Sequence, residues 1–460
     1  MRANRNSAQR RFPKSPNKAA QFLQPSNRRD TKRIDSPTET VGEIFADDSI
    51  IELVRGDSKF LQLLFWDGSK ARISSEVKKG GKTFVPPTAF EQEVLQAVRL
   101  PRHPRPYGTT EQLTDNLHNW FAQHPGLPDE SISILVCFTL CTLFREFIEV
   151  LPALSVVAPD PSNSALLLRL LECVCWHSLR VVEASNMGVF ALPSPLHRTI
   201  LLDQEKPTKR LQGTLRAMGY PGGLIRQNGQ YHDISCPIVI CSGQPLGEPA
   251  PPNVIQVVLM PSRGCLPRIE WKSLREAGDE LQGKLLQYRL VNFKRVRESK
   301  FNPNGLHTPL AETARSVGAC IVDHPKLQSH IVELLKPQDE DRRIRHSTGI
   351  PEVVIEVAFT LCHQGNRSSI YVSEFADASN AVLENRKEII RLEPRAVGDV
   401  LRNIGLFTER LGSAGRGIRL LNEIRRKIHR LAYSYDVLSM RDGVDRCEFC
   451  VELRETAASK

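Results

Sequence analysis

Short buried strands alternate with helices between residues 109 and 271, and this alternation constrains the fold more than any other feature of the sequence. Apolar, β-prone runs lie at 153–158, 179–183, 199–203, 237–241 and 254–260. Stretches with helical spacing of apolar residues separate most of these runs, notably 164–176. Strands joined through helices pair in parallel and are buried on both faces. The pattern therefore predicts an α/β core built on a largely parallel sheet.

The segments on either side of this core differ from it in composition and divide the 460-residue chain into six expected units. A disordered basic arm occupies residues 1–40, a small β-containing unit with a linker follows at 41–106, and the α/β core spans 107–271. The remaining units are a helical region at 272–365, a winged-helix domain at 366–440 and a C-terminal tail at 441–460. Three prolines between residues 101 and 106 mark the linker, because proline interrupts helices and strand ladders alike.

The chain is basic, with 62 lysine and arginine residues against 52 aspartate and glutamate residues and a formal net charge of +10. The arm alone holds ten basic and three acidic residues among few apolar ones, a composition typical of disorder. Such a segment attracts a phosphate backbone without sequence preference, although it could equally serve as a solubilising tail. The charge balance favours DNA as the partner.

Export and membrane insertion are not expected. The longest apolar run, at 131–144, has fourteen residues and falls short of the roughly 20 that cross a bilayer. The eleven cysteines are an odd number without a framework spacing, which indicates reduced thiols. We therefore expect a cytoplasmic protein with no membrane contact.

The loop after the first core strand has the architecture of a phosphate site. A buried strand at 153–158 ends in a tight loop that opens a helix, whose N-terminal amide groups and dipole favour an anion. The strand at 199–203 ends in Asp203, a carboxylate that can help hold magnesium. The strand at 237–241 ends in small polar residues. Because parallel strands end at one edge of a sheet, Pro161, Asp203 and Ser242 should lie together.

With these strands and loops the chain resembles the P-loop ATPases of bacterial and phage mobile elements, a family related to AAA+ and superfamily-3 helicases and often linked to primases. The resemblance covers roughly residues 110–435 and includes 117–128, 151–154 and 215–226. It rests on strand order and spacing more than on identities. It implies an AAA+-type sheet, a helical lid region and a C-terminal winged helix. It also implies a phosphate-binding Walker A loop, a Walker B acid at Asp203, and ATP with magnesium as cofactors.

The expected Walker A loop lacks the residues that bind a nucleotide in that family. Its three glycines, its lysine and its magnesium-binding hydroxyl residue fall on Ala158, Pro161, Asn163, Ser164 and Ala165. Proline has no N–H to donate, serine has no positive charge for the β- and γ-phosphates, and alanine offers the metal no oxygen. The catalytic glutamate falls on Gln204, whose amide cannot accept a proton from water.

Three functions remain open at this point. The chain could be a catalytically degenerate ATPase relative that binds DNA without a nucleotide or metal cofactor. An active nucleoside triphosphatase or helicase would need a nonstandard loop, with Glu205 in place of the missing glutamate. A protein-interaction scaffold would instead partner an active ATPase or a primase, and homo-oligomers are compatible with each function. We expect the first, because the loop loses the lysine and metal contacts that hold a triphosphate.

The segment from 373 to 435 predicts a winged helix. Two helices are expected at 373–386 and 394–405, a hairpin at 407–421 and a further helix at 425–435. The glycine-rich stretch 412–417 resembles a nucleotide loop only superficially, because no Lys-Ser/Thr pair follows it, and it predicts the turn of the hairpin.

Ten basic and four acidic residues between 391 and 430 make this segment a candidate DNA-binding surface. Arg395 and Arg402 are expected on the exposed face of the second helix, where they could reach a major groove. Arg410, Arg416 and Arg419 lie on or beside the wing and suit phosphates. A solvated basic face or a protein-docking surface is the alternative.

Cys447 and Cys450 form a C-x-x-C pair near the C-terminus. A structural zinc ion needs four ligands, and no second cysteine pair or closely spaced histidine pair completes the site in the sequence. We therefore expect a simple turn, with a zinc site completed by a partner chain as the alternative.

Overall fold

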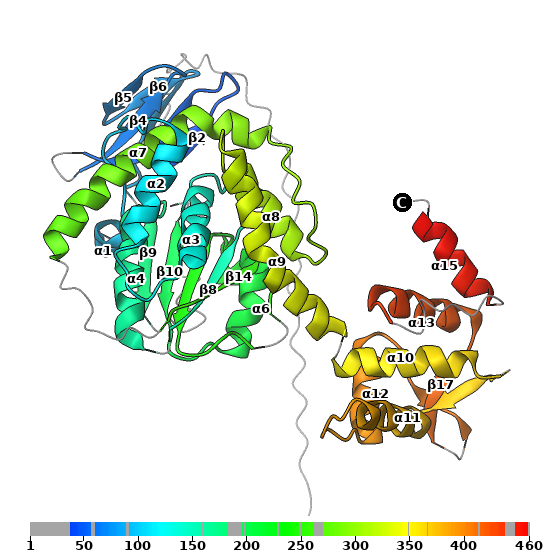
Figure 1. Cartoon of the computed structure of the whole chain (residues 1–460). Coiled ribbons are helices and arrows are strands. Elements are labelled where there is room, and N and C mark those ends of the chain that lie inside the picture. The colour runs from blue at the N-terminus through cyan, green and yellow to red at the C-terminus, as the bar shows by residue number, and fades with distance from the viewer. Residues whose placement is uncertain are drawn as a thin grey trace, which may run out of the picture.

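The computed structural model describes residues 37–458 with internal gaps and groups them into an N-terminal β unit, an α/β core and a C-terminal unit (Figure 1). The gaps lie at residues 57–59, 89–91, 159, 183–195, 197, 228–229, 248–249, 261–269, 348, 366, 413–414 and 438–446. Residues 1–36, and with them nearly all of the predicted basic arm, lie outside the described part. Among the described helices, none is both long and apolar enough to cross a membrane.

The core is a five-stranded, fully parallel sheet. Its strands are β8 (Ala153–Val157), β9 (Ser178–Val182), β10 (Thr199–Asp203), β13 (Ile238–Ser242) and β14 (Val254–Val258). Their spatial order is β14-β8-β13-β10-β9, so β8 lies between the last two strands of the sequence. The register pairs Leu154 of β8 with both Val239 and Ile255. The predicted parallel α/β core is confirmed, with strand limits that agree within two residues.

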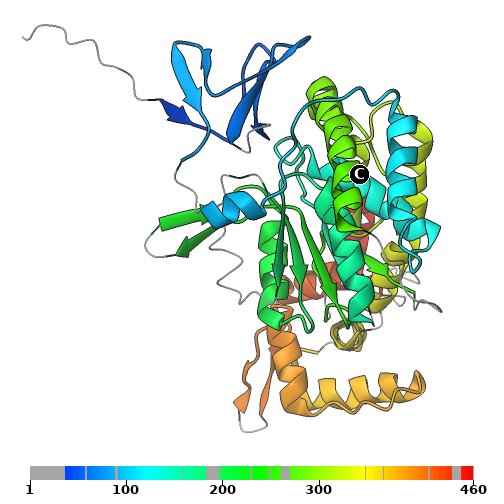
Figure 2. The ribbon, with the colours of Figure 1, turned by 90° about the vertical axis from the view of Figure 1, so that its left-hand side faces the viewer.

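Helices cover both faces of this sheet, and alternate residues of its inner strands belong to two apolar clusters (Figure 2). Leu201 and Val239 face one cluster, and Ile200 and Ile238 face the other. The first cluster includes helices α2 (Thr110–Phe121), α3 (Asp129–Thr142), α4 (Pro161–Val174) and α7 (Trp271–Arg297). The second includes helix α6 (Lys209–Met218).

The N-terminal β unit consists of two small sheets and helix α1 (Gln92–Ala97). A four-stranded antiparallel sheet contains, in spatial order, β2 (Gly42–Ile44), β3 (Ile50–Arg55), β4 (Leu61–Trp66) and β5 (Ala71–Ser74). The other sheet has the order β1 (Thr38–Glu39), β7 (Lys82–Val85) and β6 (Val77–Lys79). Because β1 begins at Thr38, the β unit starts before residue 41, the start that the sequence predicted.

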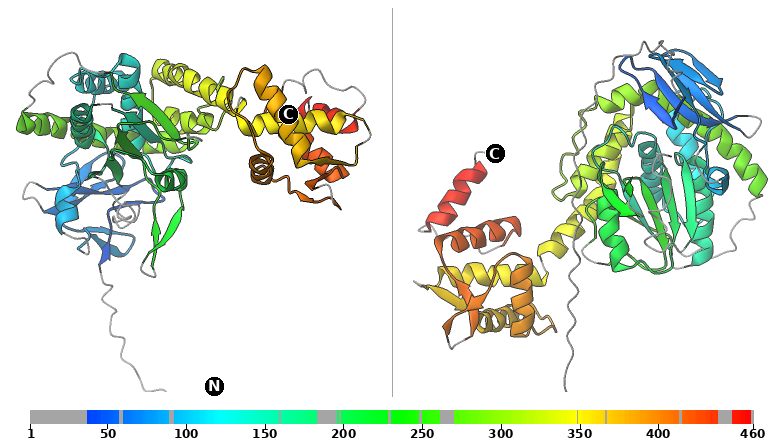
Figure 3. Two further views of the ribbon diagram at one scale, coloured as in Figure 1. Left: turned by 90° about the horizontal axis from the view of Figure 1, so that it is seen from below. Right: turned by 180° about the vertical axis from the view of Figure 1, so that it is seen from behind.

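Helices α8 (Leu310–Ala319) and α9 (Pro325–Ser347) pack against the core, and α9 leads to the C-terminal unit (Figure 3). Helix α10 (Ile350–His363) belongs to that unit, because its buried Val353 and Val357 share a cluster with residues 370–437. The sequence predicted that the C-terminal unit begins at residue 366, whereas its core includes helix α10 from Ile350. Apolar spacing marks α10 as a helix without showing which core it joins.

The C-terminal unit has the winged-helix order of helix, strand, two helices, hairpin and helix. After α10 come β15 (Ser369–Tyr371), α11 (Val372–Asn385), α12 (Pro394–Asn403), β16 (Glu409–Arg410), β17 (Arg416–Arg419) and α13 (Asn422–Ser434). Strands β16 and β17 pair antiparallel, so the hairpin predicted around 412–417 is confirmed. The predicted tail contains helix α15 (Glu448–Ala458), which packs on α13.

A buried ion cluster joins the β unit to the core. The guanidinium of Arg289, on α7, donates to Glu52 on β3 (Nε–Oε1 2.7 Å) and to Glu146 (Nη1–Oε2 3.1 Å). It also donates to the carbonyl of Leu143 and lies 5.1 Å from the ring centre of Trp176. Burial alone would lower the pKa of Arg289, but the two carboxylates outweigh it and raise this pKa above its usual value. One charged side chain thus holds three segments that are distant in sequence.

Replacing Arg289 with methionine should lower the free energy of unfolding by about 3–5 kcal/mol, because it removes one partner of the buried Arg289–Glu52 ion pair. The matched control is Arg295→Met on the same helix, whose ion pair with Asp323 is exposed and should contribute less than about 1 kcal/mol. Urea denaturation of the full chain, followed by circular dichroism, measures both losses. Equal losses in the two variants would contradict a special role for the buried cluster.

Candidate nucleotide and nucleic-acid sites

The carboxyl ends of β8, β13 and β10 meet at one edge of the sheet. Ala158, just after β8, donates its backbone N–H to the carbonyl of Ser242 over 2.8 Å. Gln204, just after β10, donates its backbone N–H to the end of β13 over 2.9 Å. Helix α4 begins at Pro161, and Asp203 ends β10, so both lie at this edge. The prediction that Pro161, Asp203 and Ser242 lie at a common edge of the sheet is confirmed.

An aspartate occupies the place where the N-terminus of α4 would face a phosphate. Asp160 is the N-cap of α4, and its Oδ1 accepts hydrogen bonds from the backbone N–H of Ser162 (2.9 Å) and from the Ser162 hydroxyl (2.7 Å). These hydrogen bonds lower the pKa of Asp160, so the carboxylate is ionised at neutral pH. Pro161, the first residue of the helix, has no N–H. A phosphate arriving here would meet a negative charge.

The next residues of the expected loop make contacts within the protein. Asn163 is buried, and its backbone carbonyl accepts a hydrogen bond from Nε2 of His124 (2.9 Å). The Nδ1 atom of the same histidine accepts a hydrogen bond from the backbone N–H of Gly126 (3.1 Å). The Ser164 hydroxyl donates to the carbonyl of Pro161 over 2.7 Å. Ala165 is half-buried. None of these three loop side chains carries a cation for a phosphate or a carboxylate for a metal.

The acid at the end of β10 is also paired within the protein. Asp203 Oδ2 lies 3.2 Å from the guanidinium of Arg180 on the neighbouring strand β9. A magnesium ion at Asp203 would therefore compete with a cation that is already present. Gln204 Nε2 is 3.4 Å from the carbonyl of Lys206, and Glu205 is exposed. The edge thus lies where the sequence predicted a nucleotide site, but its two carboxylates, Asp160 and Asp203, already have partners within the protein.

A groove between α12 and the β16–β17 wing brings together three of the five predicted DNA-binding arginines. Arg395 and Arg402 of α12 line it with Arg416 of the wing, beside Ser373 and Thr408. All five predicted arginines, Arg395, Arg402, Arg410, Arg416 and Arg419, are exposed. The structure therefore gathers arginines from two elements on one hollowed surface.

Weak local contacts orient several of these arginines. Arg402 pairs with Asp399 (3.0 Å) and Arg419 with Glu409 (2.6 Å), and Arg416 donates to a wing carbonyl over 2.6 Å. Exposed ion pairs of this kind contribute about 1 kcal/mol or less to stability. The arginines can therefore exchange these partners for phosphates at little cost.

Arg425, which adds to the basic composition of the segment, has a structural role instead. Its guanidinium donates to the carbonyls of Cys362 (2.7 Å), Arg367 (2.6 Å) and Leu420 (3.2 Å). These bonds tie α13 to the end of α10, to the segment just before β15 and to the residue that follows β17. The basic face is thus smaller than the composition indicates.

The structure contains an exposed hairpin, formed by β11 (Leu224–Gln227) and β12 (Gln230–Asp233), that was not predicted from the sequence. The two strands project from the core (Figures 2 and 3). Tyr231 is 69 % exposed, and the guanidinium of Arg226 lies 5.9 Å from its ring centre. An exposed ring beside a cation is a surface on which unpaired bases stack. The Asn-Gly pair at 228–229 is a strong hairpin signal that could have predicted it.

A second basic cleft lies between the β unit and α7, and three of its arginines have partners within the protein. Arg55, Arg99, Arg102 and Arg275 are among its lining residues. Arg55 donates to two backbone carbonyls at 2.7 and 3.1 Å, and Arg99 forms an ion pair with Asp279. Arg102 lies 3.6 Å from the same carboxylate. These contacts favour a role in holding the β unit on the core.

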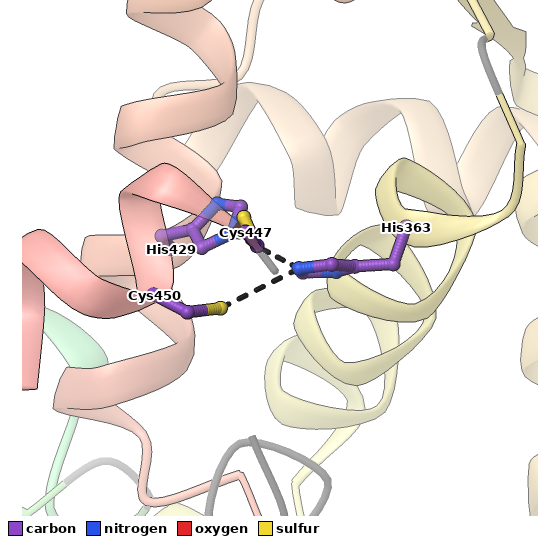
Figure 4. A group of neighbouring side chains, drawn as sticks. All are labelled: His363, His429, Cys447 and Cys450. Atoms are coloured by element: carbon purple, nitrogen blue, oxygen red, sulfur yellow. Dashed lines mark hydrogen bonds between the residues drawn. The ribbon is translucent and has the colours of Figure 1, made fainter. Parts of the chain in front are cut away.

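Cys447 and Cys450, at the start of α15, lie beside two histidines that are distant in sequence. His363 ends α10 and His429 lies on α13, and one ligand atom from each of the four residues lies within 4.8 Å of the others (Figure 4). The pair is therefore part of a four-residue cluster and not an isolated turn. Sequence spacing could not indicate this, because 66 residues separate the two histidines.

No family model and no curated protein match the sequence. Among solved structures, the C-terminal region of NrS-1 is 12 % identical with a TM-score of 0.34, covering 80 % of this chain and 96 % of that one. The SCCmec type IV Cch active helicase is 11 % identical with a TM-score of 0.42, covering 85 % and 80 %. The JCV helicase is 12 % identical with a TM-score of 0.26, covering 51 % and 66 %. Likenesses this distant carry no functional assignment. The strand order itself shows an α/β fold with a five-stranded parallel sheet.

Proposed function

We propose that this chain is a DNA-binding relative of the AAA+ and superfamily-3 ATPases of mobile elements and has lost nucleotide hydrolysis. The observation that carries the proposal is the groove between α12 and the wing, which Arg395, Arg402 and Arg416 line together. Guanidinium groups bind phosphates and base edges, and a cluster from two elements on one surface suits the repeating charges of a duplex.

The geometry of α12 supports a role in reading DNA. Arg395 and Arg402 are seven residues apart, which places them about two turns and 10 Å apart on the same side of the helix. That distance spans about three base pairs of a duplex. The wing, with Arg416, would then contact the phosphate backbone beside the groove that α12 enters.

The edge of the core sheet supports the loss of hydrolysis. Asp160 supplies a negative charge at the N-terminus of α4, and Arg180 partners Asp203. Gln204 stands where a general base would be needed. The core would thus serve as a scaffold that carries the C-terminal unit.

Replacing Arg395 and Arg402 with alanine should weaken binding to a preferred duplex by about 1–3 kcal/mol per residue if each contacts a base, and by less on random DNA. Arg416→Ala should lower the affinity for all sequences alike, since wing contacts go to phosphates. The preferred duplex is first selected from a randomised library, and anisotropy titrations of the full chain at two salt concentrations then measure each variant.

The matched control for these titrations is Arg430→Ala, which removes an exposed arginine of α13 that does not line the groove. It should leave the affinity almost unchanged. If Arg430→Ala weakens binding as much as Arg395→Ala, general charge and not the groove binds DNA. If the full chain binds no DNA at low salt, the C-terminal unit is a protein-docking module.

The internally partnered edge predicts no saturable ATP binding in calorimetry at millimolar magnesium, and hydrolysis no faster than in buffer. Hydrolysis that disappears in Asp203→Ala would reverse this conclusion and make Asp203 catalytic. The matched control is Asp233→Ala, which removes another acid of the core, on β12, and should not alter any such activity.

A further inference from the structure

Four side chains with metal-binding atoms converge in the C-terminal unit from three helices. The Nε2 atoms of His363 and His429 are 3.2 Å apart. His429 Nε2 lies 3.2 Å from the sulfur of Cys447, and His363 Nε2 lies 3.5 Å from the sulfur of Cys450. Figure 4 shows the four side chains pointing toward a common centre.

The backbone orients both imidazole rings. His363 Nδ1 lies 2.7 Å from the carbonyl of Phe359, and His429 Nδ1 lies 2.7 Å from the carbonyl of Arg425. A carbonyl can only accept, so each Nδ1 carries a hydrogen, and the neutral imidazole of this tautomer presents the lone pair of Nε2. Two Nε2 lone pairs that face each other at 3.2 Å suit a cation that binds both. A hydrogen bond from Nδ1 to a carbonyl is also the usual support of a metal-bound histidine.

The distances fit a tetrahedral site. Zinc bonds of about 2.0–2.1 Å to nitrogen and about 2.3 Å to sulfur place the ligand atoms of a tetrahedron about 3.3 to 3.8 Å apart. The three separations above are 3.2, 3.2 and 3.5 Å, and no pair is more than 4.8 Å apart. Small side-chain rotations would close the longest separation.

We propose that His363, His429, Cys447 and Cys450 bind one zinc ion and that this ion fixes helix α15 to the winged-helix unit. Two thiolates and two neutral imidazoles are a ligand set that favours zinc over magnesium or calcium, which prefer oxygen. On binding, the two thiols lose their protons to solvent, and the two thiolates balance the charge of the ion. Four protein ligands leave no open position, so the ion is structural and not catalytic.

The surroundings support a closed structural site. The ring of Phe359 lies 4.4 Å from that of His363 and 5.1 Å from that of His429, and Phe449 lies 5.4 Å from His429. His429 and Cys450 are buried, whereas His363 and Cys447 are partly exposed and give the ion a route from solvent. The ion would join α10, α13 and α15, and residues 435–447 connect α13 to α15 in the chain.

The full chain, prepared without a histidine tag and under reducing conditions, should contain one zinc ion per molecule by mass spectrometry of the metal. Cys447→Ser and His429→Ala should lose the ion. Cys362→Ala is the matched control, because it removes a buried thiol next to His363 that lies outside the cluster, and it should keep one ion. Chelation should lower the melting temperature of the wild type but not of Cys447→Ser.

Cobalt substitution of the wild type keeps the proposal testable if a variant does not fold. Cobalt should give the strong visible bands of a tetrahedral site together with thiolate charge-transfer bands. A wild type that holds no zinc after reconstitution would overturn the proposal, and so would a full equivalent of zinc in Cys447→Ser. A Cys447–Cys450 disulfide in the protein purified under reducing conditions would overturn it as well.

Discussion

The parallel alignment of β8, β13 and β10 brings three strand ends and the start of α4 to one edge of the sheet. The residues at this edge determine whether the core can bind a phosphate. A phosphate site at this edge needs free amide groups and a cation. Here Asp160 takes the helix N-terminus, and Arg180 takes the acid at the end of β10. The sheet itself depends on apolar residues that alternate between two clusters. The residues of the loop can therefore differ without weakening the fold.

Much of the core could be predicted from the sequence, because buried parallel strands and amphipathic helices leave periodic patterns. The limits of α10 could also be predicted from its apolar spacing. The same spacing could not show that α10 belongs to the C-terminal unit, because periodicity does not indicate which hydrophobic core a helix packs against. Charge counting had a similar limit. It treated Arg425 like Arg395, although the first binds backbone carbonyls and the second lines a groove. Only the packed structure distinguishes a basic residue that holds the fold from one that is available to a ligand.

Contacts between residues far apart in sequence account for the rest of what could not be predicted. Arg289 and Glu52 are 237 residues apart, and neither lies in a motif that indicates their pairing. The cysteine pair at 447 and 450 was visible as a motif, yet the histidines that complete its cluster lie on α10 and α13. Both features connect separate segments: the ion pair joins the β unit to the core, and the proposed zinc ion joins α15 to the winged helix. The second connection does not depend on whether the groove binds DNA.

If DNA binding belongs to the C-terminal unit, as proposed, it is independent of any nucleotide at the sheet edge. The affinity of the full chain for one duplex, measured with and without ATP and magnesium, reveals any such dependence. We expect the same dissociation constant in both conditions, because a ligand that does not bind cannot shift an equilibrium. A change of about tenfold, equal to about 1.4 kcal/mol of coupling, that disappears in Asp203→Ala would contradict it.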